Sequence, residues 1–557
     1  MGVQLKHIKE YLEQEGYECV YVNNPNGDFL FVDIYIDGEV IRLKCTFPSS
    51  FPYEFPIIYI LKEFYKKYQP LPHISDSGAI CTFDTNKVFP NSKKPKELTL
   101  ESIRKAEKIL NCGILGENSE EFLDEFYAYW DLNSEVIGDL IFNPTDKPQK
   151  LLYYKGNDKF IYLSDKKSKL LNYLKYSKGW KINASKLKEA LFLPILNNWQ
   201  PPFPKTNNDI IELLKNEQHY NRYIDYMKNN KSRRVIIFSQ KIDNSLCICG
   251  WEHKKEDTPN GFRINSIDPM YLYKNLYGDN TIKNIRVNQL GHNRLYNRGG
   301  DGAIKDGIKI SITGCGSVGS YITKTLVDLG INNFTLIDND ELSPENTARH
   351  YCGASYYRYK KVDAIKEELL RHYPDIECKV IAENVFSVIE SRISEFNECD
   401  YNFIAVGNIA IEEKFISLIN NIKIDKPIII LWVEPYLIGG HALILQKPQD
   451  INFLFDENYA FKDRVITNGE EYIQKEAGCH STFLPYSAFE LQIFANEVVD
   501  FINTRLIEKN DKSNYSLSWG GRVDKIRRSK NGMKINSMWM ASNGRELKIR
   551  RLDDETI

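Results

Sequence analysis

Short apolar runs alternate with helix-type apolar spacing along residues 300–557. Strand-like runs lie at 308–313, 333–338, 378–382, 402–406, 427–432 and 440–446, and helical patterns lie at 320–329, 361–371, 411–420 and 485–504. This alternation is typical of a mostly parallel sheet with helices on both faces. The sequence therefore predicts an α/β, doubly wound domain over residues 296–557.

The first part of the chain has a different pattern. A helical pattern covers residues 4–15, and three partly alternating apolar runs follow, separated by the turn signals N-G-D and D-G-E. Helical patterns return at 99–111 and 118–130. A helix followed by an antiparallel meander indicates an α+β domain over residues 1–145. Residues 146–295 mix both patterns, and we expect a mixed linker domain there.

Composition restricts the classes of function. The chain has 557 residues, 42% of them hydrophobic, and a formal net charge of −2. No global field favours nucleic acid or an anionic membrane, and no apolar stretch reaches the 18 residues of a membrane span. The charged, amphipathic N-terminus lacks the apolar centre of a signal peptide. Eleven cysteines without a Cys-x-x-Cys pair suit a reducing cytoplasm better than a disulfide framework or a zinc ribbon.

A glycine-rich turn begins the predicted doubly wound domain. Gly314, Gly316 and Gly319 follow the apolar run I-K-I-S-I and precede a helical pattern. A strand, a tight turn and a helix present free backbone N–H groups to a phosphate. Asp338 ends the next strand-like run, where a carboxylate can hold ribose hydroxyls. A dinucleotide-binding turn would show the same features, but it would leave the polar residues that follow without a role.

Those residues are Asp340, Asn346, Arg349 and Lys361. The spacing of the two aspartates, Asn346 and Arg349 resembles the motif of the ThiF/MoeB adenylating fold used by ubiquitin-activating enzymes. The resemblance implies a Rossmann-type domain that binds ATP. It assigns ribose to Asp338, phosphates to Asn346 and Arg349, and a position near the reacting centre to Lys361. Fixed cations there would stabilise the charge that develops as pyrophosphate departs.

The chain departs from this family at one position. Gly407 stands where the family usually has an aspartate that helps to hold Mg²⁺, so the magnesium ligands cannot be assigned. The family also uses an arginine from just before the domain, often across a homodimer. Arg298, in R-L-Y-N-R-G-G, is the candidate, with a plain surface arginine as the alternative. The resemblance makes a homodimer the default expectation.

Activating enzymes that go beyond adenylation pass the acyl group to a cysteine. Cys479 lies in K-E-A-G-C-H-S-T before the last long helical pattern. A nearby helix N-terminus lowers a thiol pKa, and a loop position suits a nucleophile that must reach an adenylate. Cys479 is therefore the candidate for the first thioester. The alternative is a buried structural cysteine.

A second thiol lies near the N-terminus. The segment from Leu71 to Cys81 resembles the active-site stretch of ubiquitin-conjugating enzymes, in which His-Pro-Asn precedes Gly-x-Ile-Cys. Pro72, Gly78 and Ile80 match that motif, and His73 takes the place of the oxyanion-stabilising asparagine. An imidazole N–H could donate to such an oxyanion. The alternative is a noncatalytic binding module of the same fold.

Together the two ends resemble bacterial fused ubiquitin-transfer enzymes of cyclic-oligonucleotide antiphage (CBASS) operons. The resemblance implies that ATP activates a protein C-terminus, that of a cGAS/DncV-like nucleotidyltransferase, as an acyl-adenylate. Cys479 and then Cys81 would carry it to an acceptor amine. Two alternatives stay open: activation of a ubiquitin-like or sulfur-carrier protein, and a noncatalytic scaffold with both folds degenerate.

Overall fold

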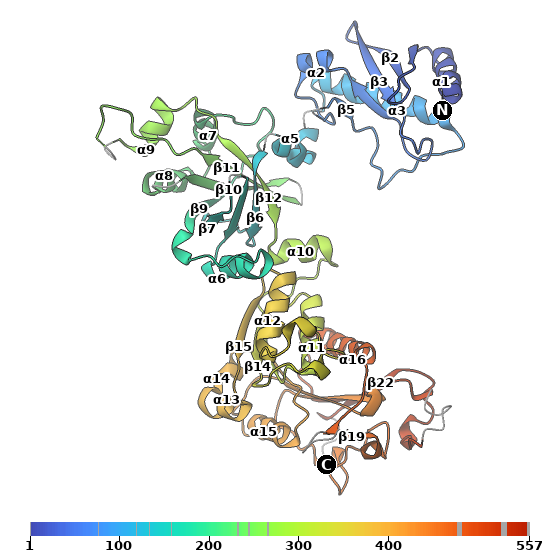
Figure 1. The fold of residues 1–557 in the computed structure, drawn as a ribbon, viewed down its shortest axis with the longest axis vertical. Helices are drawn as coiled ribbons and strands as arrows, with labels where there is room; N and C mark the ends of the chain where they lie inside the picture. The colour runs from blue at the N-terminus through green and yellow to red at the C-terminus, as the bar shows by residue number, and fades with distance from the viewer. Residues whose placement is uncertain are drawn as a thin grey trace. The chain divides into compact units, whose positions relative to one another are not determined.

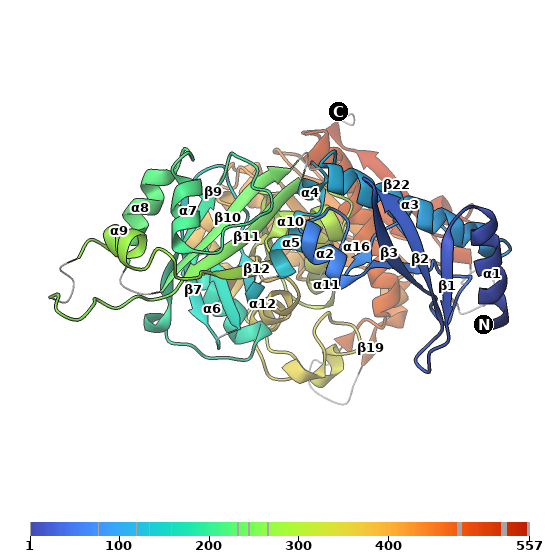
Figure 2. The ribbon, with the colours of Figure 1, turned by 90° about the horizontal axis from the view of Figure 1, so that it is seen from above.

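The computed structural model describes residues 2–75, 77–118, 120–132, 134–157, 159–230, 233–242, 245–263, 267–475, 482–524 and 532–553. The chain divides into two compact units. The first comprises residues 1–140, 144–165 and 187–288, and the second comprises residues 141–143, 166–186 and 289–557. Figures 1 and 2 show the ribbon from two directions. No helix among the described residues is both long and apolar enough to span a membrane.

The first unit begins with a five-stranded sheet in the order β1-β2-β3-β4-β5. The strands are antiparallel, and Leu5, Ile8 and Leu12 of the first helix lie in the core against them. The helix spacing and the alternating strands thus bury one common apolar face, as the sequence predicts. The elements are α1 (Gly2–Gln14), β1 (Glu18–Val22), β2 (Phe29–Ile36), β3 (Glu39–Thr46), β4 (Ile57–Ile60), α2 (Lys62–Tyr68), β5 (Ala79–Ile80), α3 (Pro95–Leu115), α4 (Glu121–Asp124) and α5 (Phe126–Leu132).

A closed seven-stranded barrel follows in the order β10-β11-β12-β6-β8-β7-β9. The parallel pairing of β9 with β10 closes it. Its first strand lies before residue 146, where the sequence analysis placed the start of the linker domain. The elements are β6 (Ser134–Ile141), β7 (Gln149–Lys155), β8 (Phe160–Ser164), β9 (Lys188–Pro194), α7 (Asn207–Leu214), α8 (Tyr220–Asn229), β10 (Arg234–Ile242), β11 (Ser245–His253), α9 (Pro269–Tyr271) and β12 (Lys283–Gln289).

Helix α5 connects the two parts of the first unit. Its Tyr129 hydroxyl donates to the carbonyl of Leu71 at 2.9 Å, while its Trp130 indole donates to the carbonyl of Ile285 at 3.2 Å. Trp130 also packs edge-on against Phe238 in the barrel core. The aromatic run near residue 130 is therefore core, since both faces of this short helix are in use.

The second unit is built on an eight-stranded sheet in the order β15-β14-β13-β16-β17-β18-β21-β22. The first five strands are parallel and the last three are antiparallel to their neighbours. The strands are β13 (Lys309–Thr313), β14 (Asn333–Ile337), β15 (Glu377–Ile381), β16 (Tyr401–Ile404), β17 (Ile428–Val433), β18 (Gly439–Leu445), β21 (Tyr515–Gly520) and β22 (Glu546–Arg551), with a separate pair, β19 (Gln474–Lys475) and β20 (Thr482–Phe483).

Helices cover both faces of this sheet (Figure 1). One core contains Phe403 together with residues of α11, α12 and α16, and the other contains Ile404 together with residues of α13, α14 and α15. Successive strand residues thus enter opposite cores, which explains the continuous apolar runs in the sequence. The helices are α6 (Lys167–Asn172), α10 (His292–Gly299), α11 (Ser317–Asp328), α12 (Lys361–His372), α13 (Val385–Arg392), α14 (Ser394–Asn397), α15 (Ile409–Asn420) and α16 (Ala488–Phe501).

Candidate functional site

The three glycines of the turn between β13 and α11 have different structural roles. Gly314 has φ = +86°, and a Cβ there would lie 2.6 Å from the carbonyl oxygen of Ala405. A Cβ on Gly319 would overlap the carbonyl oxygen of Gly314. A Cβ on Gly316 would meet nothing within 4 Å. Gly314 and Gly319 therefore allow the strand and helix to approach closely, whereas Gly316 faces open space at the start of α11.

Asp338, directly after β14, holds the glycine turn. Its Oδ2 accepts a hydrogen bond from the backbone N–H of Cys315 at 2.7 Å, and its Oδ1 accepts one from the N–H of Asp340 at 2.7 Å. The carboxylate predicted to hold ribose is thus fixed at the turn by two backbone donors.

Lys361 is the first residue of α12. Its ammonium lies 2.8 Å from Oδ2 of Asp340, and its backbone N–H donates to the carbonyl of Asp340 at 3.0 Å. The lysine side chain is 13% exposed and the aspartate side chain is 62% exposed. The cation is therefore largely enclosed, while its carboxylate partner remains in contact with solvent.

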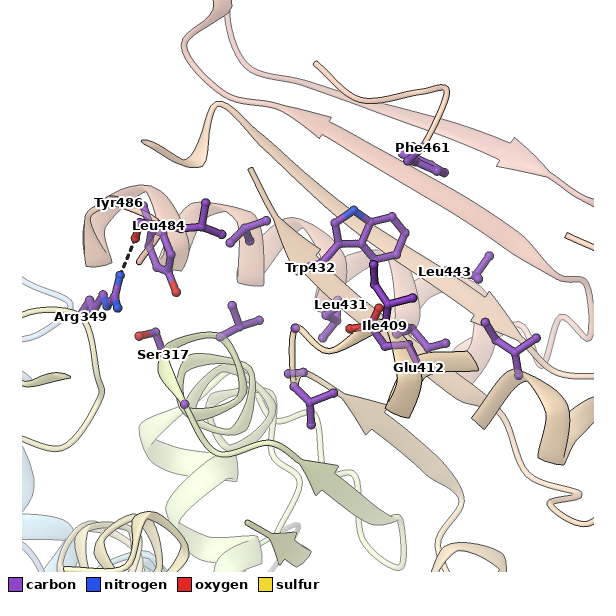
Figure 3. Close-up of a pocket in the computed structure, with 18 of the residues that line it drawn as sticks. Ser317, Arg349, Ile409, Glu412, Leu431, Trp432, Leu443, Phe461, Leu484 and Tyr486 are labelled. Carbon is purple, nitrogen blue, oxygen red and sulfur yellow. Dashed lines mark hydrogen bonds between the residues drawn. The ribbon is translucent and has the colours of Figure 1, made fainter. Parts of the chain in front are cut away.

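Arg349 lies against the segment that precedes α16 (Figure 3). One guanidinium nitrogen donates to the carbonyl oxygen of Leu484 at 2.6 Å, and the guanidinium lies 4.9 Å from the ring centre of Tyr486. Asn346 ends a short 3₁₀ turn, where its side-chain oxygen accepts the N–H of Ser343 at 3.1 Å. Both residues predicted to contact phosphates thus have defined positions.

A cavity of about 510 Å³ brings four of the predicted residues together: Gly316, Asn346, Arg349 and Lys361. It lies over the carboxyl ends of the parallel strands, where ligands bind in sheets of this topology. Four other predicted residues are not among the described lining residues. Gly314, Gly319 and Asp338 support the turn, and Asp340 pairs with Lys361. Arg298 is exposed on α10, also outside that lining.

The other end of the same cavity is apolar, which the sequence analysis did not anticipate. Trp432 and Phe461 lie in edge-to-face contact 5.1 Å apart, and Ile409 and Ile416 of α15 also line this end. Glu412 is the acidic side chain among the described lining residues, and burial raises its pKa. Tertiary packing alone brings these residues together, so no local motif could have identified them.

Gly407 lines the cavity, with φ = +59°. No group of three or more His, Cys, Asp or Glu side chains suited to a metal ion occurs among the described residues. The described side chains therefore form no complete Mg²⁺ cage of their own, and substrate phosphates and water would have to supply most of the ligands.

Cys81 follows β5 and is exposed. Its backbone N–H donates to the carbonyl of His73 at 2.8 Å, which fixes the thiol-bearing residue beside the histidine. A cleft of about 540 Å³ is lined by both residues, together with Glu121, Glu125 and Asn118. Partial burial, followed by the charges of Glu125 and Asp84, raises the pKa of the Cys81 thiol. These surroundings therefore favour the neutral thiol of Cys81 over the thiolate.

His73 is held between two carboxylates. Its Nδ1 lies 2.8 Å from Oε1 of Glu125 and its Nε2 lies 3.0 Å from Oε2 of Glu121, while its backbone N–H donates to Glu125 at 2.8 Å. The hydrogen bond with Glu125 raises the pKa of His73 despite partial burial. Both ring nitrogens are engaged, so donation to an oxyanion would require one bond to open, and that role stays a prediction. No motif near His73 indicated either glutamate partner.

Cys479 lies outside the described residues. The residues on either side of 476–481 pair as a short antiparallel ladder, Lys475 with Thr482 and Gln474 with Phe483. The assignment of Cys479 to the first thioester therefore stays a prediction.

Two protein families match the two ends of the chain. The ThiF family matches residues 293–446, and prokaryotic E2 family B matches residues 23–137. This chain combines both domains in one polypeptide. The fused architecture, the predicted fold class and the prediction of an enzyme are thereby confirmed.

Relatives of known name match most of the chain at low identity. Among them are two proteins called ATP-dependent ubiquitin transferase-like protein Cap2. The one from Pseudomonas aeruginosa is 22% identical over 479 residues, covering 79% of this chain and 82% of that protein. The one from Escherichia coli is 22% identical over 513 residues, covering 80% and 82%. Among solved structures, the match to PaaA has a TM-score of 0.29 and 18% identity. The match to E. coli MccB with AMPCPP and MccA has a TM-score of 0.28 and 15% identity. Each match covers 44% of this chain and 64% of the chain in the solved structure.

Proposed function

We propose that this chain uses ATP to activate the C-terminal carboxylate of a protein and then transfers the acyl group through Cys479 and Cys81 to an amine. One observation carries the proposal. A single cavity joins the start of α11, at Gly316, to Arg349, Lys361 and Asn346. A helix N-terminus and two cations converging on one space suit a triphosphate. The names of the Cap2 relatives support the same reaction class.

In the first step, a carboxylate oxygen of the tail bonds to the α-phosphorus of ATP. The bond from that phosphorus to the bridging oxygen breaks, and pyrophosphate leaves. Negative charge grows on the phosphate oxygens, and Arg349 and Lys361 would stabilise it more strongly than the ground state. One guanidinium nitrogen of Arg349 donates to the carbonyl of Leu484, and the remaining N–H donors of the guanidinium would bind phosphate.

Mg²⁺, as the usual companion of ATP, would screen the phosphate charge. The described residues provide Asp340, whose carboxylate is already paired with Lys361, and they provide no cluster of ligands. Phosphates and water would therefore supply most of the ligands of the ion.

In the later steps, a sulfur atom replaces the phosphate. The Cys479 thiolate attacks the acyl carbon, a thioester forms and AMP leaves. The Cys81 thiolate then displaces the Cys479 thiolate. Finally an acceptor amine, such as that of lysine, attacks the thioester, loses a proton and forms an amide as the Cys81 thiolate leaves. Each intermediate remains activated.

The partner and assembly belong to the same proposal. The tail would be that of a cGAS/DncV-like nucleotidyltransferase in an antiphage operon, and the enzyme would act as a homodimer in the cytoplasm. Arg298, exposed on α10, would then reach the ATP site of the partner subunit. These points rest on the resemblance of the two domains to the fused family.

ATP–pyrophosphate exchange tests the adenylation step. The acyl substrate is a synthetic 20-residue peptide with the sequence of the nucleotidyltransferase C-terminus, and the same peptide with an amidated terminus is the blank. Lys361→Ala should lower exchange by about 10²- to 10³-fold, as the loss of a transition-state donor does. Lys360→Ala removes the neighbouring cation, which pairs with Glu341 at 3.2 Å and does not line the cavity, and exchange should stay within about twofold.

Equal losses in the two lysine variants would contradict the role of the cavity. Exchange that also proceeds with the amidated peptide would contradict activation of a carboxylate. If neither peptide supports exchange, the adenylation proposal itself fails.

A further inference from the structure

The cavity of the second unit has two chemically different ends, and adenylation explains only one of them. Gly316, Arg349 and Lys361 form the cationic end. The apolar end is defined by Trp432, Phe461, Ile409, Ile416 and Phe455. Because both ends belong to one continuous cavity, a molecule that places an anion at the first can place apolar groups in the second (Figure 3).

Sheet order decides which reactant occupies the apolar end. The glycine turn follows β13, and Asp338, the residue assigned to ribose, follows β14 on one side of it. Trp432 lies on β17 and Leu443 on β18, beyond β16 on the other side. The nucleoside and the apolar end therefore lie on opposite sides of the phosphate position. The acyl substrate, which approaches the α-phosphate, is left to fill the apolar end.

We propose that the apolar end binds the last side chains of the transferred protein tail and selects a bulky apolar residue there. This specificity rests on the proposed adenylation. The tail chain advances about 3.3–3.6 Å per residue, so the residues next to the carboxylate are those that reach the apolar end. Burying one such side chain is worth about 1.5–3 kcal/mol, which is roughly a 10- to 200-fold preference.

Glu412 makes this end selective against acidic tails. Its Oε1 accepts the N–H of Asn408 at 3.1 Å, which holds the carboxyl group at the cavity wall beside Ile409. A second carboxylate from an acidic side chain would meet both poor solvation and like charge.

Trapping with hydroxylamine tests the selectivity. The full-length protein, ATP and hydroxylamine are incubated with a pool of the 20-residue peptides in which the last three positions are randomised. Activated peptides become C-terminal hydroxamates, and mass spectrometry identifies their sequences. We expect bulky apolar residues to be enriched at least about tenfold over acidic ones among the hydroxamates.

Two variants separate binding from folding. Ile409→Glu places a charge at the apolar end at a side chain that is already 69% exposed, and it should remove the enrichment. Ile422→Glu makes the same change at a site that is 71% exposed and does not line the cavity, and it should keep the wild-type preference. Binding of ATP alone, measured by calorimetry, should be equal in both variants.

The outcomes are distinct. Hydroxamates without sequence preference, or an unchanged preference in Ile409→Glu, would overturn the specificity while leaving adenylation intact. Loss of ATP affinity in Ile409→Glu alone would place the adenine base at this end and also overturn it. Absence of hydroxamates from both the pool and the natural tail would overturn adenylation and the specificity together.

Discussion

At the scale of single residues, His73 shows how its neighbours set the charge of a side chain. The hydrogen bond with Glu125 raises the pKa of His73, and the bonds from His73 offset the burial of Glu125 and lower its pKa. A raised histidine pKa adds stability that is fully present below the unfolded value, near 6.5, and is lost as pH rises through the folded value. A lowered glutamate pKa adds stability that is lost as pH falls through that folded value. The pair is therefore most stabilising between the unfolded pKa of the glutamate and the unfolded pKa of the histidine.

We expect His73→Gln to weaken the local structure by about 1 kcal/mol near pH 6, with a difference from wild type that shrinks as pH rises towards 9. Hydrogen exchange of the amides of Leu71 and of residues 73–75, corrected for intrinsic exchange rates, measures the free energy of local opening. In Glu125→Gln only Glu121 remains as a carboxylate beside His73, so the pH dependence should become weaker than in wild type. A difference between wild type and His73→Gln that stays constant from pH 6 to 9 would contradict the charged pair.

At the scale of elements, two glycines of the turn from β13 to α11 have different roles, one in packing and one at the cavity. A Cβ on Gly319 would overlap Gly314, whereas a Cβ on Gly316 meets open space and enters the cavity. Gly319→Ala should lower the melting temperature by at least about 3 °C, because overpacking costs roughly 1–3 kcal/mol. Gly316→Ala should melt within about 1 °C of wild type yet lose ATP–pyrophosphate exchange, because its methyl group occupies phosphate space. The reverse order of melting temperatures would contradict this division.

Elements with local signals were predicted closely. The run at 308–313 became β13, and the pattern at 361–371 became α12 with Lys361 at its start. The sequence analysis predicted no strand at β22, because four of the six residues of this edge strand are charged and none of the six is buried. The barrel was also missed, since its closure depends on β9 pairing with β10 about 40 residues later, and local periodicity does not encode that distance.

The candidate site likewise contains residues that a local sequence pattern identified and residues that only tertiary packing brings to the cavity. Spacing along the sequence identified Asn346, Arg349 and Lys361, because the one connection from β14 to α12 carries the first two and ends at Lys361. Trp432 and Phe461 come from separate segments and line the cavity only through the packed sheet. Glu125 meets His73 across 52 residues, which no motif near Cys81 could indicate.

At the scale of the whole molecule, the proposed relay requires that the acyl group pass from one compact unit to the other. Cys81 belongs to the first unit and residue 479 to the second. In the relay, Cys81→Ala should accumulate a reducible thioester at Cys479 and lower conjugates by at least about 100-fold, since a nucleophile is lost. Cys479→Ala should leave neither thioester nor conjugate. Cys378→Ala, at a half-buried cysteine on β15, is the control and should match wild type. Nonreducing gels with a labelled tail read all three variants.

Conjugates that persist in Cys81→Ala would replace the relay with transfer from a single thiol. ATP–pyrophosphate exchange without any thioester would favour sulfur-carrier chemistry.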